Sequence, residues 1–379
     1  TQEGIDQGNT VCDEATLRKL YLPPYKAAVK AGVGSIMVSY NSWNGKKMSA
    51  NKYLLTDVLK GELGFQGFLV SDWAAIDQLS PDYKQDIEQA INAGLDMVMI
   101  PYGPGHANNY VEFIEDLKQL VAEGKVPQSR IDDAVRRILR VKYAMGLFEH
   151  DDTDPKLTAA IGSAAHRAVA RQCVRESLVL LKNDNQVLPL SKHIKHLVVV
   201  GEAADDLGVQ CGGWTIDWQG DQGNVTHGGT TILSAIKQAV SPETEVTFSP
   251  AGDNIKDADA IIAVVGELPY AEMKGDRTNF DLAAGYDALI AGAKASGAPV
   301  VTILLSGRPL ILGEALTDSA AFIAAWLPGT EGEGVADTLF GDSHFTGKLP
   351  RVWPRNNLQL STSSAQIRPL FHFGFGLQD

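Results

Sequence analysis

The sequence predicts an α/β protein of two domains, and two of its features support this fold class. Short apolar runs that end at or near a glycine alternate with segments whose apolar residues recur at helical spacing. Continuous apolar strands joined by amphipathic helices are typical of parallel sheets that are covered on both faces. The length of 379 residues also fits more than one domain, because domains hold roughly 100–200 residues each.

The first part of the chain holds about three strand–helix units. Apolar runs predict strands over residues 33–40, 67–73 and 95–101. Helices are expected over residues 51–64, 83–94 and 129–146, with one more before the last of these. Asn51 and Ser129 occupy positions where helices are capped. Three units are too few to close an eight-unit barrel, so this part is either a small open sheet or a truncated barrel.

The pattern changes at residues 149–163, where acidic residues, a proline and a glycine indicate a linker. A helix is expected next, over residues 163–181. Buried-strand runs follow at residues 196–201, 258–266, 299–307 and 320–329. Helical patterns accompany them at residues 230–240, 281–297 and 330–341. This alternation predicts a doubly wound parallel sheet, followed by an irregular aromatic tail.

The composition narrows the choice of ligand. The formal net charge of −13 argues against nucleic acid and against anionic membrane surfaces as partners, since both require clustered lysine and arginine. No apolar run approaches the roughly 18 residues of a membrane-spanning helix. Cys12, Cys173 and Cys211 are too few and too scattered for a disulfide framework or a zinc site. The net charge fits a neutral or cationic small ligand but does not select one. Motifs for nucleotides, catalytic zinc and serine nucleophiles are absent.

Candidate site residues follow the predicted strands, because parallel α/β folds bind ligands at the carboxyl ends of their strands. In the first part these positions hold Tyr40, Asn41, Trp43, Asp72 and Trp73. In the second part they hold Glu202, Glu267, Glu272, Lys274 and Asp276. A glycine-rich loop over residues 212–221 adds Trp214, Asp217, Trp218 and Asp221.

Carboxylates combined with loop tryptophans suggest a site for a sugar. A tryptophan face stacks on the apolar C–H face of a pyranose, and carboxylates bind its hydroxyl groups. Glycoside hydrolysis needs two carboxyl groups, which lie roughly 5–5.5 Å apart when the anomeric configuration is retained and farther apart when it is inverted. The residues alone leave a structural role for these acids open, because any α/β protein carries acidic side chains near its strand ends.

Segments along nearly the whole chain resemble glycoside hydrolase family three, and within it the exo-acting β-D-glucan glucohydrolases. In chain order they include SYNSWNGKKMSAN, GFLVSDWAAID, RIDDAVRRILRVKYAMGLFE, CGGWTIDWQGD, GELPYAEMKGD, SGRP, AAWLPGTEGEGVADTLFGD and FHFGFGL. The resemblance implies that residues 1–148 form the C-terminal part of a (β/α)8 barrel. It implies that the linker over 149–163 leads to an α/β sandwich over 164–379, with a doubly wound and mostly parallel sheet.

The resemblance also implies a function and a set of site residues. The enzyme would be a retaining exo-glycosidase that releases glucose from the non-reducing ends of β-glucans or β-glucosides by double displacement, without a cofactor or metal. Asp72 would be the nucleophile and Glu272 the acid/base. The implied substrate contacts are Tyr40 beside the nucleophile, a clamp of Trp73 and Trp218 around the leaving-side sugar, and Trp214 nearby. An arginine of the family pattern is replaced by Gln78, which bears on linkage preference.

Earlier strand ends of the family, which grip the non-reducing sugar, have no counterpart among these residues. We therefore expect the chain to be one piece of a longer enzyme, with the missing N-terminal half of the barrel as its partner. A periplasmic or extracellular location is expected because polymeric glucan lies outside the cell. Alternatives are a related β-xylosidase, an N-acetylglucosaminidase, a glycoside phosphorylase, or a non-catalytic sugar-binding protein.

Overall fold

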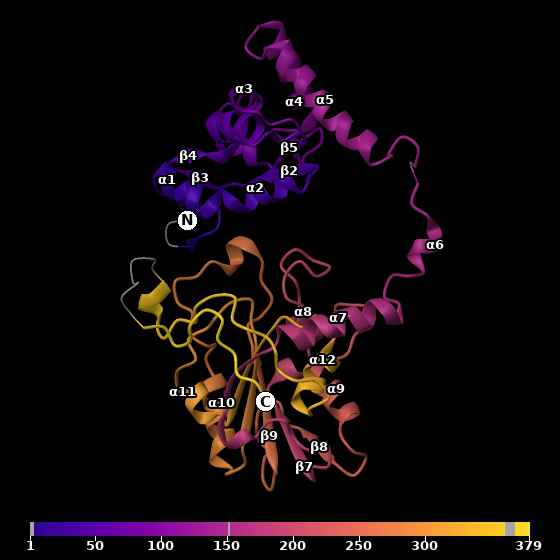
Figure 1. Ribbon diagram of the computed structural model, residues 1–379, viewed down its shortest axis with the longest axis vertical. Coiled ribbons are helices and arrows are strands. Elements are labelled where there is room, and N and C mark those ends of the chain that lie inside the picture. The colour runs from indigo at the N-terminus through magenta and orange to yellow at the C-terminus, as the bar shows by residue number, and fades with distance from the viewer. Residues whose placement is uncertain (1–3, 151, 361–367) are drawn as a thin grey trace. The chain divides into compact units, whose positions relative to one another are not determined.

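The computed structural model describes residues 4–150, 152–360 and 368–379 (Figure 1). The chain divides into two compact units, residues 1–154 and 155–379, and each has its own hydrophobic core. Among the described residues, no helix has the length and apolar character that a bilayer crossing requires. The cysteines Cys12, Cys173 and Cys211 are all free.

The first unit mixes short strands with helices. Its strands are β1 (Asn9–Thr10), β2 (Ser35–Val38), β3 (Ser42–Trp43), β4 (Lys46–Lys47) and β5 (Phe68–Ser71). Its longer helices are α2 (Pro23–Lys30), η4 (Tyr53–Glu62), α3 (Tyr83–Ala93), α4 (Tyr110–Ala122) and α5 (Gln128–Ala144). Short helical turns are α1 (Glu14–Thr16), η2 (Leu17–Tyr21), η3 (Met48–Ala50) and η5 (Ala75–Gln78).

Strands β2 and β5 form the parallel pair that positions the first candidate site. Their register pairs Ser35 with Phe68 and Val38 with Ser71, so both strands end at the same edge. The strand predicted over 95–101 is only partly formed. It runs beside β5, where the main-chain N–H of Ser71 donates to Met97 O at 3.0 Å and an isolated bridge joins Val70 to Met97. Within the described residues, this segment forms no strand pairing beyond that single bridge.

Two helix caps were predicted in this unit, and one of them is wrong. The side chain of Asn51 accepts a hydrogen bond from the N–H of Leu54 at 3.1 Å, as expected for a cap of the helical segment that starts at Lys52 and continues as η4. Ser129 is not a cap, because α5 already begins at Gln128 after Pro127, whose backbone is extended. Proline fixes φ near the value needed there, so it starts the helix without a side-chain hydrogen bond.

The second unit is built on a six-stranded sheet of order β6-β11-β10-β9-β7-β8. The strands are β6 (Val179–Asn183), β7 (His196–Val200), β8 (Glu245–Phe248), β9 (Ala260–Gly266), β10 (Val300–Leu305) and β11 (Ala321–Trp326). The helices are α6 (Pro155–Thr158), α7 (Ala164–Ser177), α8 (Leu207–Cys211), α9 (Ile232–Ala239), α10 (Tyr286–Ala295), α11 (Gly313–Asp318) and α12 (Gly332–Leu339). Short turns are η6 (Asp184–Gln186), η7 (Glu202–Asp205), η8 (Glu272–Gly275) and η9 (Asn357–Leu360).

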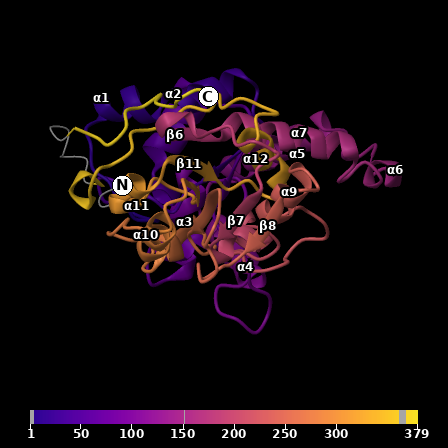
Figure 2. The ribbon, with the colours of Figure 1, turned by 90° about the horizontal axis from the view of Figure 1, so that it is seen from below.

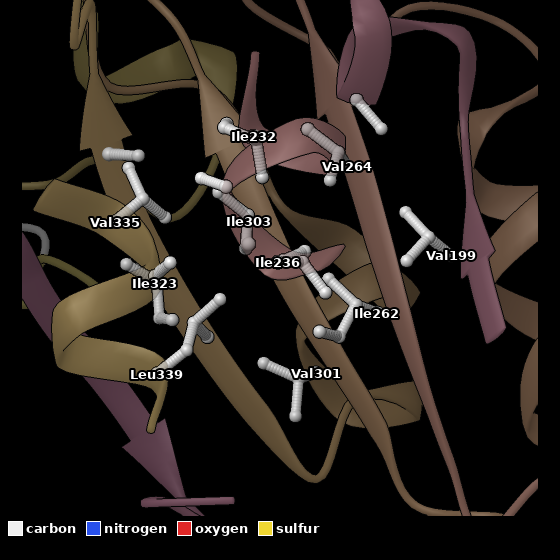
Figure 3. Close-up of a cluster of buried hydrophobic side chains, with 14 of the residues drawn as sticks. Val199, Ile232, Ile236, Ile262, Val264, Val301, Ile303, Ile323, Val335 and Leu339 are labelled. Carbon is white, nitrogen blue, oxygen red and sulfur yellow. The ribbon is translucent and has the colours of Figure 1, made fainter. Parts of the chain in front are cut away.

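Helices cover both faces of this sheet. Figures 1 and 2 show α10 and α11 on one side and α7, α9 and α12 on the other. Every residue of β9 and β10 is buried, which explains why both sequences are apolar except for Thr302. Figure 3 shows the core on the α9 and α12 side, where Ile236 and Leu339 pack with strand residues such as Ile262 and Ile303.

The helix predicted over 163–181 is wrong at its end. Helix α7 stops at Ser177, and the next residues form β6, which pairs antiparallel with β11 in an otherwise parallel sheet of described strands. Leu180 packs into the core on one face of the sheet, while Val179 and Leu181 pack into the core on the other face. A strand buried on both faces needs such a continuous apolar run, and a short run of this kind does not distinguish a strand from a helix.

Parts of the second unit differ from the predicted alternation of strands and helices. Helix α6 lies inside the linker predicted over 149–163, and strand β8 was not predicted. The aromatic tail packs onto the unit, because Trp353 is fully buried and its indole N–H donates to Leu310 O at 2.7 Å. Part of the predicted irregular tail, residues 361–367, lies outside the described residues.

Candidate active site

Asp72 lies at the carboxyl end of β5, where the main chain holds it on both sides. Its N–H donates to Val38 O of β2 at 3.1 Å, and its Oδ1 accepts a hydrogen bond from the N–H of Trp73 at 2.8 Å. The Ser71 hydroxyl donates to Asp72 O at 2.8 Å. Ala74 then has a left-handed backbone with φ of 50°, which turns the chain sharply after the strand. The half-buried carboxylate is therefore fixed at the strand edge.

Aromatic and polar side chains surround this strand end. Trp73 is 57% exposed, so its ring is available to a ligand. The Tyr40 hydroxyl donates to the carbonyl oxygen of Trp73, which places the phenol against the main chain beside Asp72. Lys47 Nζ donates to Tyr40 O at 2.9 Å and to Gln78 Oε1 at 2.7 Å. Burial lowers the pKa of the Lys47 ammonium.

Lys47 was not singled out by the sequence, although it belongs to the SYNSWNGKKMSAN segment. Its ammonium connects the segments after the two strands, because it joins Tyr40, two positions after β2, to Gln78 on the turn after β5. Gln78 also donates to Gln7 Oε1 at 2.9 Å. Gln78, where the resemblance led us to expect an arginine, therefore lies within a series of hydrogen bonds.

Glu272 lies in the second unit, at the start of the η8 turn that follows β9. Its backbone is left-handed with φ of 47°, and its side chain is exposed. The indole N–H of Trp218 donates to Glu272 Oε2 at 3.0 Å. The N–H of Ala271 donates to the side-chain oxygen of Gln219 at 3.0 Å. Trp218 and Gln219, two neighbouring residues of the loop over residues 212–221 (the tryptophan loop), thus hold the Glu272 carboxylate and the peptide before it.

The loop over residues 212–221 brings two of the predicted tryptophans together. The N–H of Trp214 donates to Trp218 O at 2.8 Å, and the ring centroids lie 6.4 Å apart with planes tilted by 57°. Trp214 is 69% exposed and Trp218 is 40% exposed, so both present ring surface to solvent. Gly213 has no room for a side chain, because an added Cβ would lie 2.1 Å from Tyr270 O. The tryptophan loop therefore packs directly on the Glu272 loop.

Glu267, another acid in the same segment, has a different environment from Glu272. The side chain of Glu267 is only 8% exposed and forms ion pairs with Arg277 at 3.2 Å and with Arg308 at 3.3 Å. A buried carboxylate that is paired with two guanidinium groups has a structural role, because removing it would leave those charges without their partner. Glu272 is exposed, so of these two acids it is the one that a substrate can reach.

The predicted site residues thus form two groups, Asp72 with Trp73 and Tyr40 in the first unit, and Glu272 with the tryptophan pair in the second. Among the described residues, no group of three or more histidine, cysteine or acidic side chains has a geometry that could hold a metal ion.

Family models match both parts of the chain. The glycosyl hydrolase family 3 N terminal domain matches residues 1–141, and the glycosyl hydrolase family 3 C-terminal domain matches residues 178–378. Among curated proteins, the lysosomal beta glucosidase of Dictyostelium discoideum is 33% identical over 99% of this chain and 49% of its own length. The periplasmic beta-glucosidase of Salmonella typhimurium is 33% identical over 99% of this chain and 56% of its own. A beta-xylosidase of Formosa agariphila is 32% identical over 99% and 57%.

Solved structures agree with these matches. The exo-1,3/1,4-beta-glucanase (ExoP) from a Pseudoalteromonas species is 40% identical with a TM-score of 0.92, covering 100% of this chain and 49% of that one. A beta-glucosidase from Listeria innocua in complex with glucose is 27% identical with a TM-score of 0.87, covering 100% and 56%. The chain spans about half the length of the curated relatives it matches, between 49% and 57% in these three. The chain belongs to glycosyl hydrolase family 3.

Proposed function

We propose that the protein acts as a retaining exo-glycosidase on β-glucans or β-glucosides, with Asp72 as nucleophile and Glu272 as acid/base. The observation that carries the proposal is that each family domain contributes one acid of the family pattern, Asp72 at the end of β5 and Glu272 in the exposed η8 turn. The similarity to proteins named beta-glucosidase and exo-1,3/1,4-beta-glucanase supports the substrate class.

The mechanism has two displacements. In the first, the Asp72 carboxylate attacks the anomeric carbon while the bond to the leaving oxygen breaks and Glu272 gives its proton to that oxygen. In the second, Glu272 takes a proton from water as the water attacks the anomeric carbon and the ester bond to Asp72 breaks. The net configuration at the anomeric carbon is retained. The exposed faces of Trp73, Trp214 and Trp218 supply stacking surfaces for sugar rings, and Tyr40 lies against the peptide that follows the nucleophile.

The architecture proposed with this function is that of the family. The first unit corresponds to the C-terminal part of a (β/α)8 barrel, and the second to an α/β sandwich. In the described part of the first unit, β2 pairs with β5 alone, and Met37 of β2 is 54% exposed. This supports the proposal that further barrel strands, carrying the remaining sugar contacts, complete the site. The periplasmic and lysosomal relatives support a location outside the cytoplasm.

The nucleophile is tested in the full-length protein with Asp72→Asn. We expect the variant to lose turnover of an activated aryl β-glucoside by on the order of 10⁴-fold, because the amide cannot form the ester. A 2-deoxy-2-fluoroglucosyl fluoride should label the unsubstituted protein, and peptide mass analysis should locate the label on Asp72. Asp57→Asn, at an exposed position of η4, is the matched control and should keep full activity. Full activity of Asp72→Asn, or a label elsewhere, would refute the assignment.

A β-xylosidase is the second candidate function, because one relative of 32% identity carries that name. The ratio of kcat/KM for 4-nitrophenyl β-glucoside and β-xyloside decides between the two, and the N-acetylglucosaminide extends the same comparison. Formation of a sugar phosphate in phosphate buffer would identify a phosphorylase. Binding of oligosaccharide without turnover of any of these substrates would identify a sugar-binding protein.

A further inference from the structure

A cluster of charged side chains lies next to the η8 turn that carries Glu272, and most of its members are largely buried. We define it as Glu267, Tyr270, Arg277 and Arg308. The Tyr270 hydroxyl donates to Glu267 Oε2 at 3.0 Å, and Arg308 Nε donates to the Tyr270 oxygen at 2.7 Å. Arg308 also pairs with Glu267 at 3.3 Å, so these three side chains close a triangle of polar contacts. Burial and the Glu267 charge raise the pKa of Tyr270 to about 12, which keeps its proton in place.

The cluster rests on the rigid centre of the sheet. Glu267 directly follows β9, and its N–H donates to Leu305 O at the end of β10 at 3.0 Å. Arg308 follows β10, and the Ser306 hydroxyl donates to Arg308 O at 2.8 Å. Both strands are fully buried. Glu267 and Arg308 are therefore fixed by the two central strands rather than by the loop itself.

Arg308 connects the ends of these two strands to the chain on both sides of Glu272. On the amino side it contacts Tyr270, with its guanidinium carbon 4.1 Å from the centroid of the ring. On the carboxyl side its Nη1 donates to Gly275 O at 2.7 Å, at the last residue of the η8 turn. One planar guanidinium group thus holds residues two positions before and three positions after Glu272. This use of several donors in a fixed plane is specific to arginine, because lysine offers a single point charge.

The loop needs such support because its backbone is strained. Glu272 adopts a left-handed φ of 47°, which a residue other than glycine keeps only when its surroundings impose it. The fit around Tyr270 is also tight. An added Cβ at Gly275 would lie 2.6 Å from the Tyr270 ring, and one at Gly307 would lie 2.9 Å from its hydroxyl oxygen.

We propose that Arg308 is a positioning residue for the acid/base, acting through Gly275 and Tyr270 to hold Glu272 where it can deliver its proton. The inference rests on the proposed role of Glu272. Arg308 itself does not exchange a proton in the reaction. Its effect falls on the step that needs a correctly placed acid, which is departure of a poor leaving group.

The test compares Arg308→Lys with the unsubstituted full-length protein on aryl β-glucosides of graded leaving-group acidity. We expect kcat/KM to fall by on the order of 10²-fold for phenyl β-glucoside, within the range that general acid catalysis contributes. For 2,4-dinitrophenyl β-glucoside, which needs no proton, kcat/KM for glycosylation should change by less than about threefold. Arg351→Lys, at an exposed arginine of the same unit, should leave both substrates unaffected. Equal losses on both substrates would overturn the inference, because a general structural defect has no leaving-group dependence.

Two further variants distinguish a failure of the positioning role from a failure of the proposed acid/base assignment. Tyr270→Phe removes the hydroxyl at the centre of the cluster without changing its charge, and we expect a smaller loss with the same leaving-group dependence. It replaces Arg308→Lys as the test if that variant does not fold. Glu272→Ala reports on the proposed function itself. If Glu272→Ala lacks leaving-group dependence, the acid/base assignment fails, whereas dependence in Glu272→Ala but in neither cluster variant overturns only the positioning role.

Discussion

The indole N–H of Trp218 donates a hydrogen bond to Oε2 of Glu272, with 3.0 Å between the two atoms. The two residues come from different loops, 54 positions apart in the chain. The contact engages one oxygen of the carboxyl group, and in the proposed mechanism the other oxygen exchanges the proton. Trp218 therefore has two roles in the proposed site, since its exposed ring face also offers a stacking surface to a sugar.

Trp218→Phe separates these two roles. Phenylalanine keeps an aromatic face but has no N–H, so the carboxyl group loses a hydrogen bond that involves a charged partner. Such bonds contribute about 1.5–3 kcal/mol when buried, and the exposed position argues for the lower value. We expect kcat on an unactivated β-glucoside to fall roughly tenfold, while KM changes less than about threefold.

Trp218→Ala is the companion variant, because it removes the ring as well as the N–H. Its KM should rise in addition to the loss in kcat. If Trp218→Phe lowers affinity as much as Trp218→Ala and leaves kcat unchanged, the hydrogen bond has no part in catalysis. Steady-state kinetics on the same substrate series measure both outcomes.

The contact between the two loops should be sensitive to Gly213. An added Cβ there would lie 2.1 Å from Tyr270 O, so Gly213→Ala must push the tryptophan loop away from the Glu272 loop. We expect kcat to fall at least tenfold with little change in global stability, because the displaced loops are at the surface. Gly292→Ala is the control, since no atom lies within 4 Å of its added Cβ on α10. It should be neutral, or stabilising by up to about 1 kcal/mol.

Much of the second unit could be predicted from the sequence, and its errors have a common cause. Strand β9 is recognisable because all of its residues are apolar or glycine and are buried between two helix layers. Strand β6 also begins with an apolar run, but this run follows α7 almost directly. The local sequence pattern therefore predicts that the helix continues through it. Only the pairing with β11, more than 130 residues away, distinguishes the two.

The candidate site shows the same limit. Asp72 and Trp73 stand out because a buried strand ends at them, and Trp218 because tryptophan is rare in a glycine-rich loop. Without the family resemblance, the local sequence pattern does not separate Glu267 from Glu272, since both follow β9 within six positions. The difference is set by Arg308, which comes from the end of β10 and buries Glu267 in an ion pair. The different roles of these two acids depend on contacts between neighbouring strands, which cannot be read from the order of the residues.

Stability of the first unit should depend on Asp96, whose side chain is completely buried. It accepts hydrogen bonds from Lys60 Nζ at 2.8 Å, from Arg130 and from the N–H of Leu69 at 2.8 Å. Asp96→Ala leaves both cations buried without this partner, which typically costs 3–5 kcal/mol. We expect about 3 kcal/mol of lost unfolding free energy in urea titrations.

The control for this prediction is an exposed ion pair of the same unit. Glu115 pairs with Lys118 at 2.8 Å, but both side chains are more than half exposed. Glu115→Ala should change the unfolding free energy by less than about 1 kcal/mol, because solvent screens such pairs. Equal effects of the two substitutions would show that burial of the Asp96 network contributes nothing.

Asp86 should make the stability of the first unit depend on pH between 4 and 6. It is 1% exposed, and burial raises its pKa to about 6 from the ordinary value of 3.8, although it accepts a hydrogen bond from the Ser80 hydroxyl at 2.6 Å. The folded state therefore binds a proton more tightly than the unfolded state. This contribution to stability is fully present below pH 3.8 and is lost as the pH rises through 6.

Asp86→Asn removes the charge but keeps an oxygen that accepts from Ser80. At pH 7 the variant should be more stable than the unsubstituted protein by about 1–2 kcal/mol, because no carboxylate has to ionise in a buried site. The advantage should shrink towards pH 4, where the native aspartic acid is also neutral. Asp57→Asn, at an exposed position, makes the same change of charge and should shift the unfolding free energy by less than about 0.5 kcal/mol. Chemical denaturation of all three proteins at pH 4, 5, 6 and 7 measures the difference. A constant offset across this range would mean that Asp86 does not titrate there.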